Sequence, residues 1–376
     1  MHQRPKTRQP LCQMTPPTGH VETGRSSELS APARPEVVDP LQYPDWDTLV
    51  AAHERAGVVH GTGWARVLQS TYGHRPHYIC RFEGRQLAGL LAIMEVSSRW
   101  TGRRGVSLPF MDFCPALKAE GQDLGPLYEA AVELGRERRW RYLECRSAGG
   151  GWAGAWPSLT FHGHVIDLAP GAEGLFNRLD STVRRGIRKA EAAGLRVEFS
   201  GSLEAARTFY GLHCRTRRRH GLPPQPWQFF ENIQRHVLEG GRGFVATVRR
   251  RKQPLAAAVF FCDGRRALYK YGASDYAFQL LRPNHLLMWE AMRHCAAGGL
   301  SELHLGRTSL GNEGLRRFKL SLGASEETVA YCRYDFSAGR FVRDADRAEG
   351  WFNRVFALLP LPLLRLAGRI LYPHLS

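Results

Sequence analysis

Arginine side chains stand at two places in the sequence where an anionic ligand could bind. Arg307 begins the segment Arg307-Thr308-Ser309, directly after a predicted strand that ends at Leu305, and ligands of α/β folds commonly meet the loops at strand ends. Its guanidinium can hold a phosphate or carboxylate with two hydrogen bonds, with Ser309 beside it, although an ion pair within the loop is an equally good explanation. Arg184 and Arg188 lie four residues apart on one face of a predicted helix, so they can hold a phosphorylated substrate or simply form its solvated side.

Covalent catalysis and metal chemistry find little support in the sequence. No Ser-His-Asp or Cys-His set and no Gly-x-Ser-x-Gly segment is present, so direct attack by a substrate group is favoured over a covalent intermediate. His74-x-x-His77 and His162-x-His164 lack a third ligand nearby, and the eight cysteines form no Cys-x-x-Cys pair. We therefore expect no metal site, and reduced cysteines in a cytoplasmic protein.

The charge balance is strongly basic. The chain of 376 residues has 52 Lys and Arg against 35 Asp and Glu, a net charge of +17, which indicates a polyanionic partner. Phosphates of a cofactor, a tRNA, a lipid-linked substrate or the inner membrane surface all fit this charge, and a solvated basic face remains the alternative. The length suits two domains plus tails.

In the first half the spacing of apolar residues predicts mixed helices and strands. We expect helices over Asp45–Ala56 and Thr62–Thr71, a hairpin over His77–Val96, a strand near Gly105–Phe110 and a helix over Leu124–Trp140. A strand over Tyr142–Arg146 then precedes the glycine-rich break at 149–151. This order predicts an α/β layer fold.

The second half repeats this order more clearly. After a strand over Phe161–Leu168, the apolar residues Leu175, Leu179, Val183 and Ile187 recur on one face of a predicted helix over Leu175–Ala193. The remaining predicted elements are helices over Leu203–Arg219 and Trp227–Leu238, strands over Gly243–Val248, Leu255–Cys262 and Arg266–Ala273, a helix over Leu286–Ala297, a strand over Glu302–Leu305, a helix over Glu313–Leu320 and a strand over Thr328–Phe336. Two tandem copies of one fold are therefore predicted.

These elements set the predicted domain boundaries. Residues 1–40 form a polar, proline-rich flexible tail, 41–158 the N-terminal domain, 159–345 the C-terminal domain and 346–376 an amphipathic C-terminal tail. The longest apolar run, Val355–Leu364, is half the ~20 residues that a spanning helix needs and holds two prolines. We expect no transmembrane segment, and the tail either contacts the inner membrane peripherally or docks on the protein body.

Several long sequence segments, called phrases below, carry a family resemblance over about residues 45–345. The chain resembles the FemAB-like transferases of the acetyltransferase (GNAT) superfamily, in particular the type associated with PEP-CTERM/exosortase exopolysaccharide loci. The matching phrases are Trp64–Pro76, Ser107–Phe110, Ser181–Gly194, Tyr269–Trp289 and Leu305–Gly323. The resemblance implies an α/β (α+β) fold of two tandem GNAT-like acyltransferase domains that transfer an acyl or aminoacyl group to an amine without a metal.

The resemblance also implies site residues. Lys319 matches the lysine of the family's Arg-Phe-Lys phrase, so it is the first candidate for a catalytic cation that neutralises donor phosphate or developing negative charge. Arg316, three residues earlier, shares its helix face and is a second candidate for the donor site. Asp112 follows the Ser107–Phe110 phrase and can act near the acceptor amine, or only cap a turn.

Around the donor, the resemblance points to a strand end and a helix start. Ser274 ends a strand, and Asn284 begins the helix that in GNAT enzymes faces the cofactor pyrophosphate. Tyr271, earlier in the same strand, is a candidate substrate-binding residue, as are Arg184 and Arg188. The usual glycine-rich turn is absent there, which favours a FemAB-type donor or a modified coenzyme A site. Asn312 and Glu313 are explained by helix capping alone.

The predicted function is N-acyl transfer to an amine of a cell-envelope, peptidoglycan or exopolysaccharide precursor. The donor is acyl-CoA or aminoacyl-tRNA, bound as a substrate, and no cofactor is held tightly. Two alternatives remain: an acyl-CoA-dependent N-acetyltransferase of small molecules, and a non-catalytic RNA-binding protein that uses the arginine runs.

Overall fold

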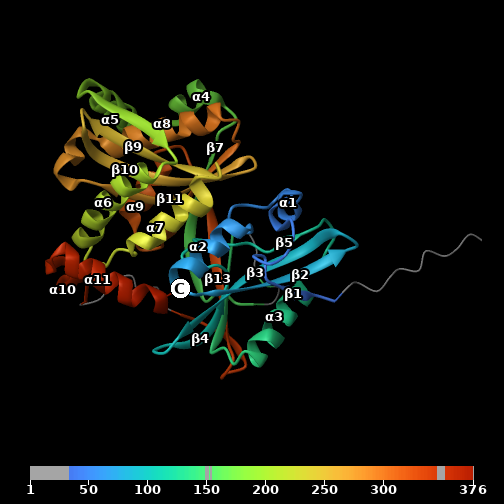
Figure 1. Ribbon diagram of the computed structural model, residues 1–376. Helices are drawn as coiled ribbons and strands as arrows, with labels where there is room; N and C mark the ends of the chain where they lie inside the picture. Colours follow the sequence, from blue (N-terminus) through green and yellow to red (C-terminus); the bar gives the residue numbers. More distant parts are fainter. Residues whose placement is uncertain (1–33, 149–151, 153–154, 345–351, 376) are drawn as a thin grey trace, which may run out of the picture. The chain divides into compact units, whose positions relative to one another are not determined.

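The computed structural model describes residues 34–148, 152, 155–344 and 352–375. The N-terminal half is an α/β layer built on one hairpin (Figure 1). Its elements are β1 (Glu36–Val38), α1 (Trp46–Ala51), α2 (Thr62–Tyr72), β2 (Arg75–Glu83), β3 (Gln86–Ser98), β4 (Gly102–Val106), β5 (Leu117–Lys118), α3 (Gly125–Glu137) and β6 (Tyr142–Ala148).

The C-terminal half repeats this arrangement with longer helices. Its elements are β7 (Leu159–Asp167), α4 (Gly171–Arg178), α5 (Ser181–Ala192), β8 (Leu195–Ser200), α6 (Leu203–Arg219), α7 (Trp227–Ile233) with a π-helical turn (Gln234–Leu238), β9 (Gly243–Arg250), β10 (Gln253–Asp263), β11 (Arg266–Ser274), a 3₁₀ turn (Tyr276–Leu281), α8 (Pro283–Ala297), β12 (Glu302–Ser309), α9 (Glu313–Leu320), β13 (Ser325–Asp335) and β14 (Arg340–Val342). Two helices, α10 (Phe352–Leu358) and α11 (Leu361–Leu371), and a 3₁₀ turn (Tyr372–His374) follow.

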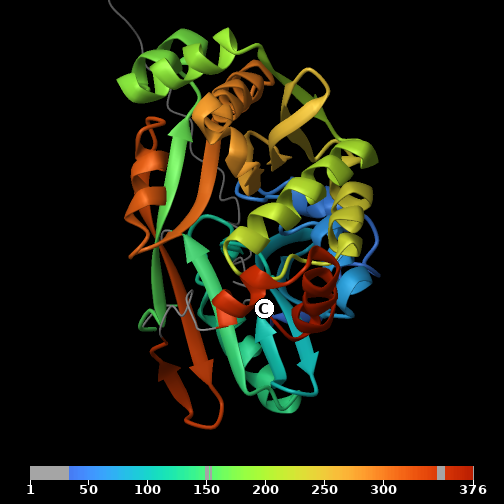
Figure 2. The ribbon, with the colours of Figure 1, turned by 90° about the vertical axis from the view of Figure 1, so that its left-hand side faces the viewer.

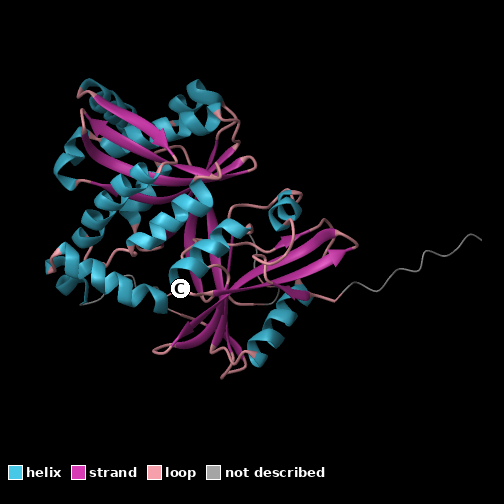
Figure 3. Ribbon diagram, in the orientation of Figure 1, coloured by secondary structure: helices cyan, strands magenta, loops and turns pink. Residues whose placement is uncertain are grey.

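One 14-stranded sheet runs through both halves. The strand order along it is β1-β2-β3-β4-β6-β13-β7-β12-β11-β10-β9-β8, with β5 and β14 beside the path. In each half the strands form an inner layer that the helices cover (Figure 3). The strand sets on either side of the β13–β7 pair mirror one another, since each contains antiparallel hairpins followed by one parallel pair.

The parallel pairs are short and mark equivalent positions in the two halves. In the N-terminal half, β4 runs parallel to β6 at Gly105 and Val106. In the C-terminal half, β11 runs parallel to β12 from Arg266 to Leu268. Beyond these residues each pair diverges, and a helix connects its two strands: α3 in the first half and α8 in the second. The repeated arrangement confirms the prediction of two related α/β units.

Pairing of β6 with β13 joins the two halves. β6, the last strand of the N-terminal half, does not pair with β7, which follows it in the chain, but with β13, whereas β7 pairs with β12 of its own half. β7 and β13 also pair with each other, from Val165 opposite Ser325 to Leu159 opposite Tyr331, and Figure 2 shows the strands of this central region along their length. The boundary predicted at 158/159 therefore separates two sequence halves that share one sheet.

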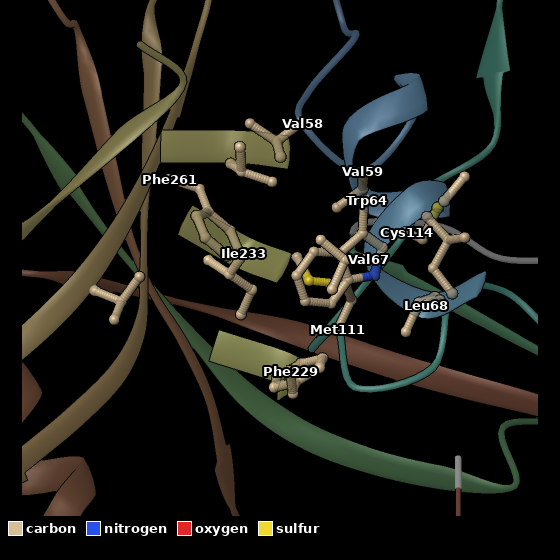
Figure 4. Packing of buried hydrophobic residues seen from close by; sticks show 14 of the residues in the cluster. Val58, Val59, Trp64, Val67, Leu68, Met111, Cys114, Phe229, Ile233 and Phe261 are labelled. Carbon is tan, nitrogen blue, oxygen red and sulfur yellow. The ribbon is translucent and has the colours of Figure 1, made fainter. Parts of the chain in front are cut away.

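A shared hydrophobic core also joins the halves. Along β10, Ala257, Val259 and Phe261 face one core cluster, whereas Ala256, Ala258 and Phe260 face another, because successive strand residues point to opposite sides. The first cluster includes Trp64 of α2, whose ring lies 5.8 Å from that of Phe229 of α7 and 5.5 Å from that of Phe261. Figure 4 shows Trp64 between the side chains of the two halves. The halves are thus fused by buried aromatic packing.

Some predicted boundaries need correction. The helix predicted over Leu175–Ala193 is two helices, because Leu179 adopts an extended conformation (ψ 141°) between α4 and α5. Leu175, Leu179, Val183 and Ile187 are nevertheless all buried in one cluster, so the periodicity detected the buried face and missed the break. The strand predicted over Gly105–Phe110 ends at Val106.

The predicted tails also differ from the structure. Glu36–Val38, inside the predicted 1–40 tail, forms β1 and pairs with Tyr78–Cys80 of β2; residues 1–33 lie outside the described residues. At the C-terminus one face of α11 docks on the body, where Leu364 and Tyr372 are buried. In the described part of the chain, no helix combines the length and apolar character needed to cross a bilayer.

Candidate active site

The loop after β4 is bound firmly to β6. The amide of Ser107 donates to the Glu144 carbonyl (2.8 Å), and the Ser107 hydroxyl accepts from the Arg146 amide (2.7 Å). Farther along, the Cys114 amide donates to the Arg146 carbonyl (2.8 Å). Met111 and Cys114 are buried in the shared core, on either side of Asp112 in the chain. These hydrogen bonds and buried side chains hold the loop in place on both sides of Asp112.

This loop is also strained. Leu108 (φ 51°) and Phe110 (φ 63°) adopt left-handed backbone conformations, which for residues with a Cβ cost on the order of 1–3 kcal/mol each and concentrate at functional sites. Leu108 is fully buried, so packing compensates for the strain. The Ser107-Leu108-Pro109-Phe110 phrase therefore forms a rigid turn that presents Asp112.

The Asp112 carboxylate enters the gap where β11 and β12 diverge. Its Oδ1 accepts from Lys270 Nζ at 3.1 Å. Lys270 lies at a bulge in β11, because Val259 pairs with Tyr271 and Phe260 with Tyr269, leaving Lys270 without a partner on β10. Asp112 comes from the N-terminal half, so the two halves build this gap together.

Gly306 makes room for the carboxylate on the β12 side. Its φ of +72° favours glycine. A Cβ atom at this position would lie 2.5 Å from Asp112 Oδ2, so any other residue would displace the carboxylate. The pairing of β12 with β7 shifts here, between His304 and Arg307, which bends the strand around the site.

Lys319 lies on the other side of Gly306. Its Nζ donates to the carbonyl oxygens of Gly306 (2.9 Å) and Arg307 (3.1 Å), and the side chain is 3% exposed. The helix α9 that carries it is capped by Asn312, whose Oδ1 accepts from the Leu315 amide at 3.1 Å. The capping explanation of Asn312 is thus confirmed.

Arg307 is a third cation near Asp112, after Lys270 and Lys319, and it lies against two aromatic rings. The Arg307 guanidinium lies 4.2 Å from the centre of the Phe161 ring and 5.1 Å from that of Tyr331, which is a cation–π arrangement. The Tyr331 hydroxyl donates to the Asp112 carbonyl at 2.7 Å. β7, β12 and β13 therefore all contribute to the same site.

The charges of the cluster adjust each other's pKa values. Burial alone would raise the pKa of Asp112, but Lys270, Arg307 and Lys319 outweigh it and hold this pKa below its ordinary value. Burial lowers the pKa of Lys270 despite the nearby Asp112 carboxylate. Burial also lowers the pKa of Lys319 to about 8, against the opposing effect of Asp112. Asp112 is therefore ionised at neutral pH and Lys319 is mostly protonated.

The structure thus brings together three of the predicted site residues, Lys319, Asp112 and Arg307. Sequence reasoning missed Lys270 and Tyr331. Lys270 stands directly before the predicted Tyr271 and inside the Tyr269–Trp289 phrase, so the signal was present, but a bulge cannot be recognised from the alternation of residue types. Ser309 ends β12 opposite Phe161, two residues beyond Arg307.

A second group of predicted residues lies at the start of α8. Asn284 Nδ2 and Ser274 Oγ are 3.5 Å apart, and His285 Nδ1 is buried without a hydrogen-bond partner. α5, which carries Arg184 and Arg188, packs closely here, because a Cβ at Gly186 would lie 2.0 Å from His285 Nδ1. The unpaired N–H groups of a helix N-terminus suit an anion.

The remaining predicted residues are placed differently. Arg316 lies on α9 and pairs with Glu326 of β13 (2.7 Å) and with Glu313 (3.5 Å). Tyr271 is packed among aromatic rings, and its hydroxyl is buried without a hydrogen-bond partner. Lys270 Nζ lies 5.0 Å from the centre of the Tyr271 ring, which links this residue to the cluster.

Two other features lie outside this cluster. A cavity of ≈ 740 Å³ is lined by Arg104, Tyr142 and Arg333 among others, at the start of β4 and β6, whereas Asp112 lies beyond their ends. Within the described ranges, no group of three or more His, Cys, Asp and Glu side chains is arranged to hold a metal ion.

The comparisons with known proteins concern the domain that carries part of this site. The family model described as "Acetyltransferase (GNAT) domain" matches residues 177–320. No curated protein sequence matches the chain significantly. Residues 177–320 include α5, α8, β12 and α9, the elements that carry Lys319, Arg307 and the predicted donor residues.

Solved structures are similar in fold. The crystal structure of FemX has a TM-score of 0.63 and 15% identity, covering 81% of this chain and 98% of that chain. The C-terminal domain of a putative lysylphosphatidylglycerol synthetase from Agrobacterium fabrum has a TM-score of 0.51 and 14% identity, covering 76% of this chain and 89% of that chain. At such identities the likeness concerns the fold alone.

Residues 177–320 thus form a GNAT-type acetyltransferase domain, and the chain is an acyltransferase enzyme. The fold is the expected α/β arrangement of two tandem GNAT-like units, and the similarity to FemX extends over both of them.

Proposed function

We propose that the protein is a FemAB-type N-acyltransferase that transfers an acyl or aminoacyl group to an amine of a cell-envelope or exopolysaccharide precursor. The observation that carries this proposal is the position of Asp112. Its carboxylate lies against Gly306 in the gap between β11 and β12, with Lys270 bonded to it at 3.1 Å and with Arg307 and Lys319 beside it. Amide formation needs a proton acceptor and positive charge in one place, and this gap supplies both.

The reaction proceeds by direct attack of the acceptor amine on the donor carbonyl. The new C–N bond makes the nitrogen positively charged and strongly acidic, so the ionised Asp112 carboxylate can take its proton although the pKa of Asp112 is low. The bond from the carbonyl carbon to the donor sulfur or oxygen then breaks, and the leaving group takes a proton. Lys319 and Lys270 stabilise the negative charge that develops on the carbonyl oxygen.

Arg307 keeps its guanidinium between Phe161 and Tyr331, where it can bind an anionic group of either substrate. Three cations for one carboxylate leave an excess of positive charge in the gap, which favours an anionic ligand. Ser309, at the end of the same strand, and Arg316, on α9, complete the proposed donor side.

The donor is a CoA thioester or an aminoacyl-tRNA, and both carry phosphates. The start of α8 supports phosphate binding, because Asn284 and Ser274 meet at the N-terminus of this helix and α5 packs beside it. Arg184 and Arg188 on α5 add positive charge at its surface. No group in the cluster is a nucleophile of the Ser or Cys type, so the acyl group passes from donor to acceptor without a covalent enzyme intermediate.

The fold similarity to FemX and to a lysylphosphatidylglycerol synthetase domain supports an acceptor connected with the cell envelope. Tyr271 is the proposed acceptor contact, since its buried hydroxyl has no partner within the protein. The proposed place of action is the cytoplasmic side of the inner membrane.

The decisive experiment supplies purified protein with acyl-CoA or with aminoacyl-tRNA, together with amino sugar and peptidoglycan precursors, and detects the new amide by mass spectrometry. We expect product from one donor class, and loss of product in the Asp112→Asn variant. Full turnover by both Asp112→Asn and Lys319→Ala would exclude the proposed site. Envelope precursors from a deletion strain, which should lack one acyl or aminoacyl mass, identify the acceptor.

A further inference from the structure

The C-terminal helix α11 has two apolar faces. Leu364 and Tyr372 are buried against the protein, and a Cβ at Gly368 would lie 1.9 Å from the Pro224 carbonyl oxygen. On the opposite side Leu363, Leu366 and Ile370 are 52%, 52% and 47% exposed. At about 100° per residue, these three side chains fall within roughly 60° of one another and nearly opposite the buried face. A surface helix normally carries polar residues there.

The preceding helix also exposes apolar side chains. Val355 of α10 is 48% exposed, and Leu358, at its end, is 86% exposed. Five large apolar side chains are therefore exposed on two consecutive short helices. Such concentrations mark a surface that contacts another apolar phase, whereas single exposed apolar residues carry no such meaning. We call Val355, Leu358, Leu363, Leu366 and Ile370 the apolar face.

The charges beside the apolar face are all of one sign. Residues 352–375 contain no Asp or Glu and three exposed arginines. The guanidinium of Arg365 lies 5.4 Å from the centre of the Tyr210 ring of α6, so Arg354 and Arg369 remain as the two relevant charges. The end of α6 adds Arg218 and Arg219, and the next residues touch α10, since a Cβ at Gly221 would lie 1.9 Å from the Asn353 carbonyl oxygen. The apolar face thus has a basic edge.

We propose that α10 and α11 seat the protein on a lipid surface that contains anionic headgroups. Apolar side chains enter the boundary between headgroups and acyl chains while arginines contact the headgroup phosphates, which is how interfacial helices bind. α11 has 11 residues, so it lies along the surface and does not cross it. This inference rests on the exposed side chains and charges, and stands independently of the reaction catalysed.

Two other occupants fit the observations less well. A second copy of the chain, paired through the same face, would bring the arginines of both copies together, which is unfavourable without carboxylates between them. Residues 1–33 of this chain carry four Lys and Arg against two Glu and few large apolar residues. That segment therefore complements neither the charge nor the apolar character of the face.

The proposed lipid surface is structurally connected to the Asp112 loop. The ring of Tyr372, directly after α11, lies 5.7 Å from the ring of Phe110, two residues before Asp112. The Tyr372 hydroxyl also donates to the Pro223 carbonyl (3.2 Å) and accepts from Arg217 (2.9 Å). Docking through α11 would hold this side of the protein, including the Asp112 loop, toward the lipid surface.

The test measures binding of the full chain to vesicles of phosphatidylcholine with or without phosphatidylglycerol, by co-sedimentation. We expect binding to the anionic vesicles that weakens at high salt, and little binding to phosphatidylcholine alone. The double variant Leu363→Ser/Leu366→Ser should lose binding by about tenfold or more, because it removes apolar area from the inserted face. Arg354→Gln/Arg369→Gln should lower binding to anionic vesicles by about 30-fold, since each of the two arginines near the surface contributes about 1 kcal/mol.

The matched control is Val37→Ser/Leu280→Ser, which removes two apolar side chains that are 49% and 69% exposed elsewhere. It should bind vesicles like the unmodified chain. Equal binding to both vesicle types, or an equal loss in the control, would overturn the proposal. So would a dimer that Leu363→Ser/Leu366→Ser converts to a monomer without any vesicle binding, because a second copy would then be the occupant. Thermal melting of each variant shows whether a loss of vesicle binding results from unfolding. If the leucine variant is unfolded, Arg354→Gln/Arg369→Gln, which changes two exposed residues, tests the proposal independently.

Discussion

The two diverging strand pairs of the molecule, β4 with β6 and β11 with β12, hold buried carboxylates in different charge environments. In the N-terminal half Glu144 bonds to Arg146 (2.7 Å) and Arg333 (2.6 Å), and Arg333 also pairs with Asp344. Two arginines thus pair directly with two carboxylates. In the C-terminal half one carboxylate, Asp112, faces Lys270, Arg307 and Lys319, and the set is positive.

The difference separates a gap that backbone closes from a gap that a side chain enters. In the N-terminal half the chain's own backbone occupies the edge of β6, through the amides of Ser107 and Cys114. In the C-terminal half the Asp112 side chain enters the gap, beside a glycine. A repeated fold can therefore use one copy as a support that positions residues in the other copy.

The largest expected effect compares the two carboxylates. Asp112→Asn should lower kcat by about 10²–10⁴-fold, because an amide cannot take the proton of the attacking amine. Glu144→Gln should instead lower the free energy of unfolding by roughly 3 kcal/mol, since it leaves buried arginine charge without its partner, and should leave kcat per folded molecule nearly unchanged. Steady-state kinetics and denaturant unfolding measure the two effects. Loss of kcat in Glu144→Gln with full activity in Asp112→Asn would reverse the assignment of the two gaps.

The next effect concerns Lys319. Lys319→Met should lower kcat by about 10²–10³-fold at neutral pH, because it removes a buried cation near the developing negative charge. Lys252→Met, at an exposed turn, is the control and should keep full activity.

The pH dependence of the unmodified enzyme gives the same residue a second test. Burial lowers the pKa of Lys319 from 10.5 to about 8, so activity should decline as pH rises through about 8. Stability should respond in the opposite direction: the unfolded chain keeps this proton up to about pH 10.5, so the contribution of Lys319 to stability rises between pH 8 and 10.5. A flat activity profile across pH 8 would argue against a catalytic cation at this position.

A smaller effect tests how closely the backbone at Gly306 packs against the Asp112 carboxylate. Gly306→Ala should lower kcat by roughly tenfold, because its Cβ would lie 2.5 Å from Asp112 Oδ2 and push the carboxylate away. Gly299→Ala is the control: its φ of +78° imposes similar backbone strain, but no atom lies within 4 Å of the added Cβ. Both variants should lose about 1 kcal/mol or more of stability, and only Gly306→Ala should lose activity beyond that. Equal kcat values in the two variants would show that the fit at Gly306 is unimportant.

The smallest effect concerns the donor side of the C-terminal half. Arg188→Gln should raise the KM for the donor by about fivefold with little change in kcat, as expected for one exposed phosphate contact. Arg250→Gln, at another exposed arginine, should leave this KM unchanged. An identical rise in both variants would indicate general attraction of a polyanion by the net charge.

Much of the fold follows from local patterns in the sequence. The helices over Thr62–Tyr72, Leu203–Arg219 and Glu313–Leu320 were predicted almost to the residue, because apolar spacing, caps and prolines mark them. The apolar runs of β3 and β10 predicted strands, and the structure shows why the runs are continuous: both faces of each strand pack in a core.

The site was only partly predictable, because its geometry depends on contacts between distant segments. Lys319 and Arg307 follow from phrases in the sequence, but nothing local states that Asp112 meets them across the two halves. The bulge at Lys270 and the positive φ of Gly306 are set by strand pairing, which no periodicity reports. Whether Arg316, Ser309, Asn284, Ser274, Tyr271, Arg184 and Arg188 contact substrates stays a prediction.

The pairing of β6 with β13 has a consequence for how the chain is made. β6 is complete at residue 148, but β13, its partner on one side, begins at Ser325. A ribosome must therefore add almost the whole second half before the first half can close its sheet, and until then β6 presents an unpaired edge that can join another chain. Premature termination should yield aggregation-prone fragments, and the cell gains a working enzyme only from complete synthesis.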